Sequence, residues 1–332
     1  MSVGRVSKQI MRAIRISAFG GPENLKLETN VPIPTPGPNE VLIKVYAAGV
    51  NPVDTYIRTG TYTRVPTLPY TPGMDAAGVV EEVGSGVTNF KKGDRVLSIN
   101  SITGSYAEYT LANTLHVAHL DDKLSFSQGA SIGVPYYTAY KSLFLRAFAK
   151  PGETVLVHGA SGAVGIAAVQ ICKAHGLRVF GTAGTKEGHE LILKNGVELA
   201  FNHREGGYLE EFQKAVGGVD IILEMLSNVN LQNDLGLVNF RGRIVVIGCR
   251  GNIEINPRLT MIKESTITGV ALMTSTEPEW KTMHAALEAG QKAGWLAPVV
   301  AKVYPLSEAE QAQRDVINNT GTSGNLILDV TK

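Results

Sequence analysis

Three glycines spaced three residues apart follow a short apolar run and could hold the phosphates of a dinucleotide. Residues 155–157 are Val-Leu-Val, the glycines are Gly159, Gly162 and Gly165, and the apolar residues that follow suit a helix. In such a strand–turn–helix, the first glycine permits the tight turn and the second lets the backbone approach the pyrophosphate. The third lets helix and strand pack closely, and the helix N-terminus attracts the phosphate charge. The motif in this context predicts a dinucleotide site; the alternative is an ordinary glycine-rich turn.

Residues near the end of the next strand bear on which dinucleotide is bound. NAD sites usually carry an Asp or Glu there to hold the ribose hydroxyls. The segment 182–186 contains no acid but offers Gly184, a hydroxyl and Lys186, and His203 with Arg204 could add positive charge. These residues suit a 2′-phosphate, so the sequence favours NADPH. The alternative is that Lys186 is a solvated lysine at a helix start and that His203 only caps a loop.

The possible metal ligands are few. The chain has two cysteines, Cys172 and Cys249, so neither a four-cysteine zinc site nor a disulfide framework can be built. His116 and His119 lie three residues apart without an evident third ligand. We therefore expect no metal site.

Composition limits the class of protein. The 332 residues suggest two domains, and 44% apolar residues are enough for a sizeable core. A formal charge of +1 gives no reason to expect nucleic acid or an anionic membrane as the main partner, and 18% charged residues hint at an oligomer. The start of the chain has no apolar run, so we expect no secretory signal and a cytoplasmic protein. The uncharged stretch 154–172 is better interpreted as a strand, a turn and a helix than as a membrane span.

The periodicity predicts two kinds of structure along the chain. The first third reads as short strands separated by Gly and Pro turns, at Glu40–Ala47, Ala76–Val83 and Asp94–Ile99. From residue 150 onward apolar strands alternate with helices, which is typical of a doubly wound parallel sheet. The expected strands are Thr154–His158, Arg178–Thr182, Val219–Met225, Arg243–Gly248 and Ser265–Leu272; the expected helices are Val164–His175, Glu187–Asn195, Tyr208–Val216 and Leu231–Leu237. A helix near Glu279–Ala293 and a strand at Leu326–Val330 are expected to pack back onto the first domain.

These features, together with local motifs, resemble the medium-chain dehydrogenase/reductase superfamily, and within it the zinc-free NADPH:quinone oxidoreductases of the zeta-crystallin group. The resemblance covers residues 11 to 330. Its motifs include the segments 19–23, 49–56, 70–78, 91–96, 157–162, 202–205 and 253–258. Zinc-containing relatives have a cysteine near Asn51 and a His-Glu pair at Met74-Asp75, which this chain lacks. The resemblance implies a β-rich GroES-like catalytic domain over 1–131 and 273–332 and a Rossmann NADPH-binding domain over 132–272.

The resemblance also implies residue roles. Tyr56 borders the nicotinamide and the substrate, and Gly184 and His203 lie around the adenosine phosphate with Lys186 close by. The cofactor's pyrophosphate and nicotinamide side are assigned to Ser161, Gly162, Ala163, Val164, Asn230, Ile247, Gly248, Cys249 and Arg250. Asn325 stands where relatives often have lysine, which puts a C-terminal contribution to phosphate binding in doubt.

The activity implied by the resemblance is reduction of ortho-quinones, by one-electron transfer to the semiquinone, in a cytosolic homotetramer. A quinone is already electrophilic, so the protein's task is binding, orientation and exclusion of water. We expect Tyr56 and Asn51 to hydrogen-bond or pack on the substrate oxygen, with Tyr62 at the pocket mouth; the alternative for Tyr56 is packing alone. An NADPH-dependent 2-alkenal or enone reductase remains the alternative enzyme. Binding of AU-rich messenger RNA and a lens structural role are further properties of similar proteins, for which the scattered basic residues give no independent support.

Overall fold

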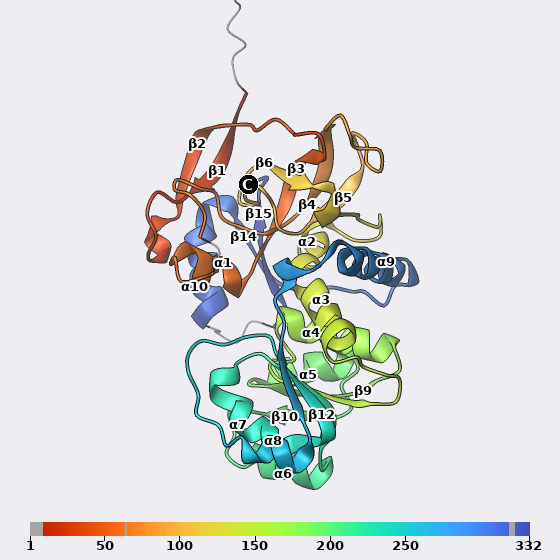
Figure 1. Cartoon of the computed structure of the whole chain (residues 1–332). Helices are drawn as coiled ribbons and strands as arrows, with labels where there is room; N and C mark the ends of the chain where they lie inside the picture. Colours follow the sequence, from red (N-terminus) through yellow and green to blue (C-terminus); the bar gives the residue numbers. More distant parts are fainter. Residues whose placement is uncertain (1–8, 64, 319–322) are drawn as a thin grey trace, which may run out of the picture. The chain divides into compact units, whose positions relative to one another are not determined.

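The computed structural model describes residues 9–63, 65–318 and 323–332, and these divide into two compact units (Figure 1). Unit 1 takes in the described residues of Met1–Gly133, Val300–Thr320 and Asn325–Lys332, and unit 2 those of Val134–Val299 and Gly321–Gly324. Each unit is built on its own sheet. The two are described separately below.

Unit 2 is built on a six-stranded sheet in the order β10-β9-β8-β11-β12-β13, with every neighbouring pair parallel. Counted along the chain this is the order 3-2-1-4-5-6, the doubly wound arrangement that binds dinucleotides where the strand order reverses. That point lies between β8 and β11. The strands are β8 (Thr154–Val157), β9 (Arg178–Ala183), β10 (Ala200–Asn202), β11 (Val219–Glu224), β12 (Val238–Val246) and β13 (Thr266–Gly269).

Helices connect these strands and cover the sheet, as the green and cyan ribbons of Figure 1 show. Helices α4 to α6 pack on β8, β9 and β10, whereas α7 and α8 pack on β11 and β12. One buried core cluster of unit 2 includes Phe180, Phe201, Phe212, Ile222 and Leu235. The helices are α3 (Gly133–Tyr140), which continues into the π-helical turn η3 (Lys141–Arg146), α4 (Ala163–Ala174), α5 (Lys186–Asn195), α6 (Tyr208–Ala215), α7 (Ser227–Leu237), α8 (Arg258–Lys263) and α9 (Glu277–Ala293), with a short 3-10 turn η4 (Leu272–Thr274).

Unit 1 is mostly antiparallel β-structure. A seven-stranded sheet runs in the order β14-β15-β3-β4-β5-β7, with β6 paired to β3, and β1 and β2 form a separate two-stranded sheet. The strands are β1 (Ile10–Arg15), β2 (Lys26–Pro32), β3 (Glu40–Val50), β4 (Asp75–Val83), β5 (Arg95–Ser98), β6 (Tyr109–Asn113), β7 (Val117–His119), β14 (Val300–Pro305) and β15 (Asn325–Asp329). The helices are α1 (Pro52–Arg58), α2 (Phe126–Gly129) and α10 (Ala309–Asn318), with 3-10 turns η1 (Pro22–Asn24), η2 (Thr114–His116) and η5 (Leu306–Glu308).

The predicted elements are largely confirmed, with ends shifted by a few residues. The stretch 154–172 is indeed a strand, a turn and a helix rather than one long helix. Among the described residues, we find no helix with the length and apolarity needed to cross a membrane. Strand β15 pairs with β3, so the end of the chain returns to the first domain as expected. Helix α9 is grouped with unit 2.

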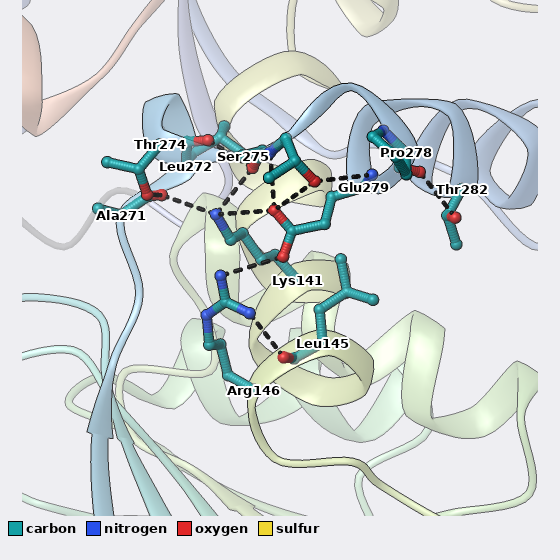
Figure 2. Close-up of polar contacts among 11 residues, drawn as sticks. Lys141, Leu145, Arg146, Ala271, Leu272, Thr274, Ser275, Pro278, Glu279 and Thr282 are labelled. Carbon is teal, nitrogen blue, oxygen red and sulfur yellow. Dashed lines mark hydrogen bonds and ion pairs between the residues drawn. The ribbon is translucent and has the colours of Figure 1, made fainter.

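The second domain boundary therefore differs from the predicted one. The sequence analysis placed 273–299 in the catalytic domain, whereas these residues are part of unit 2. Figure 2 shows one physical reason: the buried Lys141 donates from Nζ to the carbonyl oxygen of Ala271 at 2.9 Å and to Oγ of Ser275 at 2.8 Å. Arg146 adds an ion pair to Glu279 at the start of α9, at 3.1 Å. The first boundary lies at 133/134, two residues from the predicted 131/132.

Candidate functional site

The glycine motif forms the turn between β8 and α4, and each glycine has a distinct environment. Gly159 has φ +57°, the left-handed conformation that a tight turn requires and that favours glycine. A Cβ on Gly165 would lie 2.5 Å from the carbonyl oxygen of Gly159, so only glycine lets α4 approach the turn this closely. A Cβ on Gly162 would have one neighbour, at 3.4 Å, so that backbone has free space beside it. These are the roles predicted for a pyrophosphate-binding turn.

Helix α4 begins at Ala163 with Gly162 as its N-cap, and no side chain caps its first turn. The unbonded N–H groups of a helix start and the helix dipole together favour an anion at this position. Ser161 and Val164 lie on the same turn, partly exposed. The turn from Gly159 to Gly165 is therefore a suitable cradle for phosphate groups.

A buried threonine connects this turn to the next strand. Thr182 of β9 accepts a hydrogen bond from Gly159 N at its Oγ1 (3.0 Å), and its carbonyl oxygen accepts from Ala160 N (2.8 Å). The same Oγ1 lies 3.3 Å from Nδ1 of His203. Thr182 thus fixes both the glycine turn and the predicted phosphate-binding histidine. The sequence analysis did not single it out, because a threonine within a strand is unremarkable by type.

Arg204 and His203 flank Gly184, directly after β9. A Cβ built on Gly184 would lie 2.6 Å from Arg204 Nε and 2.9 Å from His203 Nε2, so both side chains lie close against the backbone of this glycine. Burial, followed by the positive charges of His158, Arg204 and His189, lowers the pKa of His203. The charges that act on His203 are thus all positive, which marks a local environment suited to an anion.

Lys186 lies apart from this pair. Its side chain is 85% exposed, and Nζ is 3.9 Å from Glu190 on the next turn of α5. These surroundings fit the alternative interpretation, in which Lys186 is a solvated lysine at the start of a helix. Arg204, which the sequence analysis mentioned only as added charge, is the residue that lies against Gly184.

The remaining predicted cofactor residues follow β11 and β12. Asn230 lies in the first turn of α7, and Ile247, Gly248, Cys249 and Arg250 form the loop after β12. Arg250 N donates to Oδ1 of Asn228 at 2.8 Å, which joins this loop to α7. Hydrogen bonds, led by the one from Ser227, lower the pKa of the exposed Cys249. Apart from Tyr56, which lies on α1 of unit 1, the predicted cofactor residues therefore lie at or after the carboxyl edge of one parallel sheet, where such folds bind their ligands.

The predicted substrate residues lie on and after α1 in unit 1. Asn51 is the N-cap of α1 and is buried; its N–H donates to Oδ2 of Asp54 at 2.9 Å and its Nδ2 to Oδ2 of Asp75 at 2.8 Å. Tyr56 is half-buried on α1, and within the described part of the chain its hydroxyl makes no hydrogen bond to another protein group. Tyr62 lies in the loop that follows and is also half-buried. The structure thus brings Asn51 and Tyr56 onto one short helix.

Asn325 opens β15 and is buried, with its Nδ2 lacking a hydrogen-bond partner. An uncharged amide cannot supply the positive charge that a lysine would bring to a phosphate. The doubt raised about a C-terminal phosphate contact therefore stands.

One group of three side chains in the described residues has atoms close enough to suggest a metal site: His158, Glu224 and Asp234, all buried, with one ligand atom from each within 4.8 Å of the others. The sequence analysis did not consider these residues together. His158 Nε2 and Asp234 Oδ1 are 2.8 Å apart, a hydrogen-bond distance. Two ligands of one tetrahedral zinc stand about 3.3 Å apart, given bonds of about 2.0–2.1 Å. The geometry is therefore that of a hydrogen-bonded group.

The chain resembles known oxidoreductases over nearly its whole length. The zinc-binding dehydrogenase family matches residues 163–289, and the alcohol dehydrogenase GroES-like domain matches residues 37–122. The quinone oxidoreductases of Sus scrofa and Homo sapiens are 55% and 54% identical over 323 residues, which is 97% of this chain and 98% of each relative.

Solved structures agree with this result. The quinone oxidoreductase of Escherichia coli complexed with NADPH superposes with a TM-score of 0.86 at 31% identity, covering 96% of this chain and 99% of the other. That of Pseudomonas syringae gives a TM-score of 0.85 at 29% identity and the same coverage. With the glycine turn, the strand order and full-length identity above one half in agreement, the chain belongs to the quinone oxidoreductase family of the medium-chain dehydrogenase/reductase superfamily.

Proposed function

We propose that this enzyme reduces quinones at the expense of NADPH, without a metal ion. The observation that carries the proposal is the arrangement at the carboxyl edge of the unit 2 sheet, where a glycine turn at a helix start adjoins Gly184 with Arg204 and His203 beside it. The turn suits a pyrophosphate, and His203 with Arg204 suits the extra phosphate that distinguishes NADPH from NADH. NADPH, when bound, supplies the reducing electrons.

The protein's own groups act by binding and orientation. Gly159, Ser161, Gly162, Ala163, Val164 and Gly165 would hold the pyrophosphate, Gly184, His203 and Arg204 the adenosine phosphate, and Asn230 and Ile247 to Arg250 the nicotinamide side. The glycines of the turn carry no side chain, so the backbone N–H groups can approach the phosphates directly. Lys186 would contribute at longer range.

Tyr56 is the proposed substrate-positioning residue. Its hydroxyl is unengaged by the described protein groups, so it is available to donate to a quinone oxygen. Nδ2 of Asn51 already donates a hydrogen bond to Asp75. Asn51 would therefore support the start of α1 and offer the remaining hydrogen-bonding capacity of its amide to the substrate. Tyr62 would border the substrate from the loop beyond α1.

We further propose one-electron reduction of ortho-quinones: one NADPH and two quinones would yield NADP⁺, a proton and two semiquinones. The other enzymatic possibility is reduction of a 2-alkenal or enone, in which a hydride is added to the β-carbon and a donor such as Tyr56 meets the developing oxygen charge. The test is NADPH titration followed by steady-state rates with 1,2-naphthoquinone and with a 2-alkenal, while electron paramagnetic resonance monitors the semiquinone. Faster turnover of the quinone with a radical signal supports the proposal. Preference for the alkenal, with no radical, overturns it.

The resemblance supports three finer proposals, each with a direct measurement. We infer a cytoplasmic homotetramer, which sedimentation and cell fractionation would test. Binding of AU-rich messenger RNA would appear as a salt-dependent gel shift that NADPH competes away. A lens structural role would require abundant protein in that tissue.

A further inference from the structure

A group of buried polar side chains lies between the end of β8 and Asn230. Asn230 donates from Nδ2 to Oε1 of Glu224 at 3.2 Å, and the N–H of Leu226 donates to the same oxygen. Glu224 is the last residue of β11, so its carboxyl group lies directly beneath the first turn of α7. Oε1 of Glu224 thereby fixes which end of the Asn230 amide faces the strand. Oδ1 of Asn230 therefore faces away from β11.

The other oxygen of Glu224 faces two further buried groups. Oε2 is 3.5 Å from Nε2 of His158, and Asp234 of α7 binds the same Nε2 at 2.8 Å. Both carboxylates are fully buried, and neither Glu224 Oε2 nor Asp234 Oδ2 receives a hydrogen bond from any described donor. Two bare carboxylate oxygens in a dry interior repel each other, and one proton held between them removes that repulsion.

The charges on this group follow from its surroundings. Burial raises the pKa of Glu224 to about 7; the charge of His158 opposes the rise, while the charge of Asp234 and a hydrogen bond to it add to it. Burial alone would lower the pKa of His158, but Asp234 and Glu224 outweigh it and raise the pKa to about 9. Near pH 6 His158 is therefore protonated and Glu224 keeps its proton.

Two titratable groups from other elements face this one. Tyr208 of α6 has its pKa raised by burial and by the charges of Asp234 and Glu224, so it stays protonated up to pH 9. His203, beyond β10, has a lowered pKa and is neutral above its ordinary value of 6.5. Glu224 is thus the group that titrates first as the pH rises above 7.

We propose that Glu224 and Asp234, with His158, are positioning residues for the cofactor: the proton shared by the two carboxyl groups keeps Glu224 in place to orient the Asn230 amide, so that NADPH binding weakens when this proton is lost. The inference rests on the proposed contact between Asn230 and the cofactor. Loss of the proton adds a negative charge to a buried group in which His158 is already hydrogen-bonded to Asp234, so the carboxyl groups separate or take in water. Either movement displaces the oxygen that holds Asn230.

The variant Glu224→Gln separates this role from mere packing. A glutamine amide has nearly the same shape, and it can donate to Asp234 on one side and accept from Asn230 and Leu226 on the other, as the protonated acid does. It cannot ionise. Asp220→Asn is the matched control, since Asp220 lies at the opposite end of the same strand, where it accepts from Thr154 and Asn239.

The experiment is a titration of the purified full-length protein with NADPH, followed by nucleotide fluorescence, from pH 6 to pH 9 at constant ionic strength. For the unaltered protein and Asp220→Asn, we expect the Kd to rise fivefold or more over this range, with a ceiling of about tenfold per pH unit for loss of one proton. For Glu224→Gln we expect a low Kd throughout. Parallel profiles for Glu224→Gln and the unaltered protein would overturn the inference.

Two further results separate the inference from the proposed function. Asn230→Ala should bind NADPH weakly at every pH, and unchanged binding would show that Asn230 does not contact the cofactor. If the unaltered protein binds NADPH but reduces no quinone, the proposed function fails while the pH profile still tests the positioning role. One equivalent of divalent metal in the purified protein, lost in Glu224→Gln, would replace the shared proton by an ion and overturn the inference.

Discussion

Asn51 donates a hydrogen bond from Nδ2 to Oδ2 of Asp75, and the two atoms are 2.8 Å apart in the interior of unit 1. Because an ionised carboxylate can only accept, the contact determines which end of the Asn51 amide is the nitrogen. A hydrogen bond thus connects the start of α1 to the start of β4.

We therefore expect Asp75→Asn to destabilise unit 1 and to slow turnover. Hydrogen bonds to charged groups are worth about 1.5–3 kcal/mol, and the new amide would present a donor to a donor in one of its two orientations. Thermal unfolding and kcat with a quinone measure the two effects. A protein that melts and turns over as before would show that the contact has no role in either.

Arg204, rather than Lys186, is predicted to discriminate NADPH from NADH. Loss of a charge-assisted hydrogen bond costs about 1.5–3 kcal/mol, so Arg204→Ala should raise the Kd of NADPH by about 10- to 100-fold and leave NADH binding unchanged. Lys186→Ala is the matched control and should change the Kd of NADPH less than about threefold, because an exposed cation contributes little. Equal losses for the two variants, or equal losses for the two nucleotides, would contradict the assignment.

The sequence predicted the parts of this site that depend on backbone geometry. A glycine at positive φ and one packed against a carbonyl oxygen leave a visible pattern, as Gly159 and Gly165 do, because other residues are excluded there. Strands buried on both faces are likewise visible as apolar runs. Contacts between side chains distant in sequence leave no such pattern. The position of Arg204 beside Gly184 and the grouping of His158, Glu224 and Asp234 therefore required the three-dimensional structure.

The same distinction explains the domain boundary. The alternation of strands and helices ends near residue 272, so the pattern alone placed the boundary there. Among the contacts that hold 273–299 in unit 2 are the hydrogen bonds of Lys141 to Ala271 and Ser275 and the ion pair of Arg146 with Glu279 (Figure 2). The sequence alone does not indicate whether a lysine side chain is buried or exposed.

Tyr56→Phe is expected to lower kcat for quinone reduction about fivefold, the equivalent of one hydrogen bond of about 1 kcal/mol, while the Kd of NADPH stays within about twofold. The phenylalanine keeps the ring and its packing, so only the hydroxyl is tested. Steady-state kinetics with 1,2-naphthoquinone and a fluorescence titration with NADPH give the two numbers. Unchanged turnover would assign Tyr56 to packing alone.

Asp54 should make the stability of unit 1 depend on pH. Burial raises the pKa of this carboxyl group to about 7, against hydrogen bonds from Asn51 and Tyr106 that lower it. A carboxyl whose pKa is higher in the folded protein contributes stability that is complete below its unfolded pKa of about 3.9 and is lost as the pH rises through 7. The melting temperature should therefore fall between pH 5 and pH 8.

Asp54→Asn removes this titration while keeping an oxygen that accepts from Asn51 and Tyr106. Its melting temperature should fall less steeply over the same range. His158 and Glu224 leave a residual slope of the same sign, because their pKa values are also raised. Identical slopes for the variant and the unaltered protein would show that Asp54 is ionised throughout.

Lys141→Met should weaken the attachment of the segment 271–293, which includes α9, to the rest of unit 2. Burial lowers the pKa of Lys141, yet its two hydrogen bonds and the carboxylate of Glu279, 4.0 Å from Nζ, hold it in the interior. Methionine fills most of the space but leaves the carbonyl oxygen of Ala271 without its donor, at a cost of about 1–3 kcal/mol. Hydrogen exchange should accelerate in 271–293 and remain unchanged in β8 and β9. The control is Lys281→Met on the exposed side of α9, where the lysine forms an ion pair with Glu277 at 2.7 Å and its loss should change exchange little. Equal protection of 271–293 in both variants would show that packing alone, rather than the buried lysine, attaches this segment to unit 2.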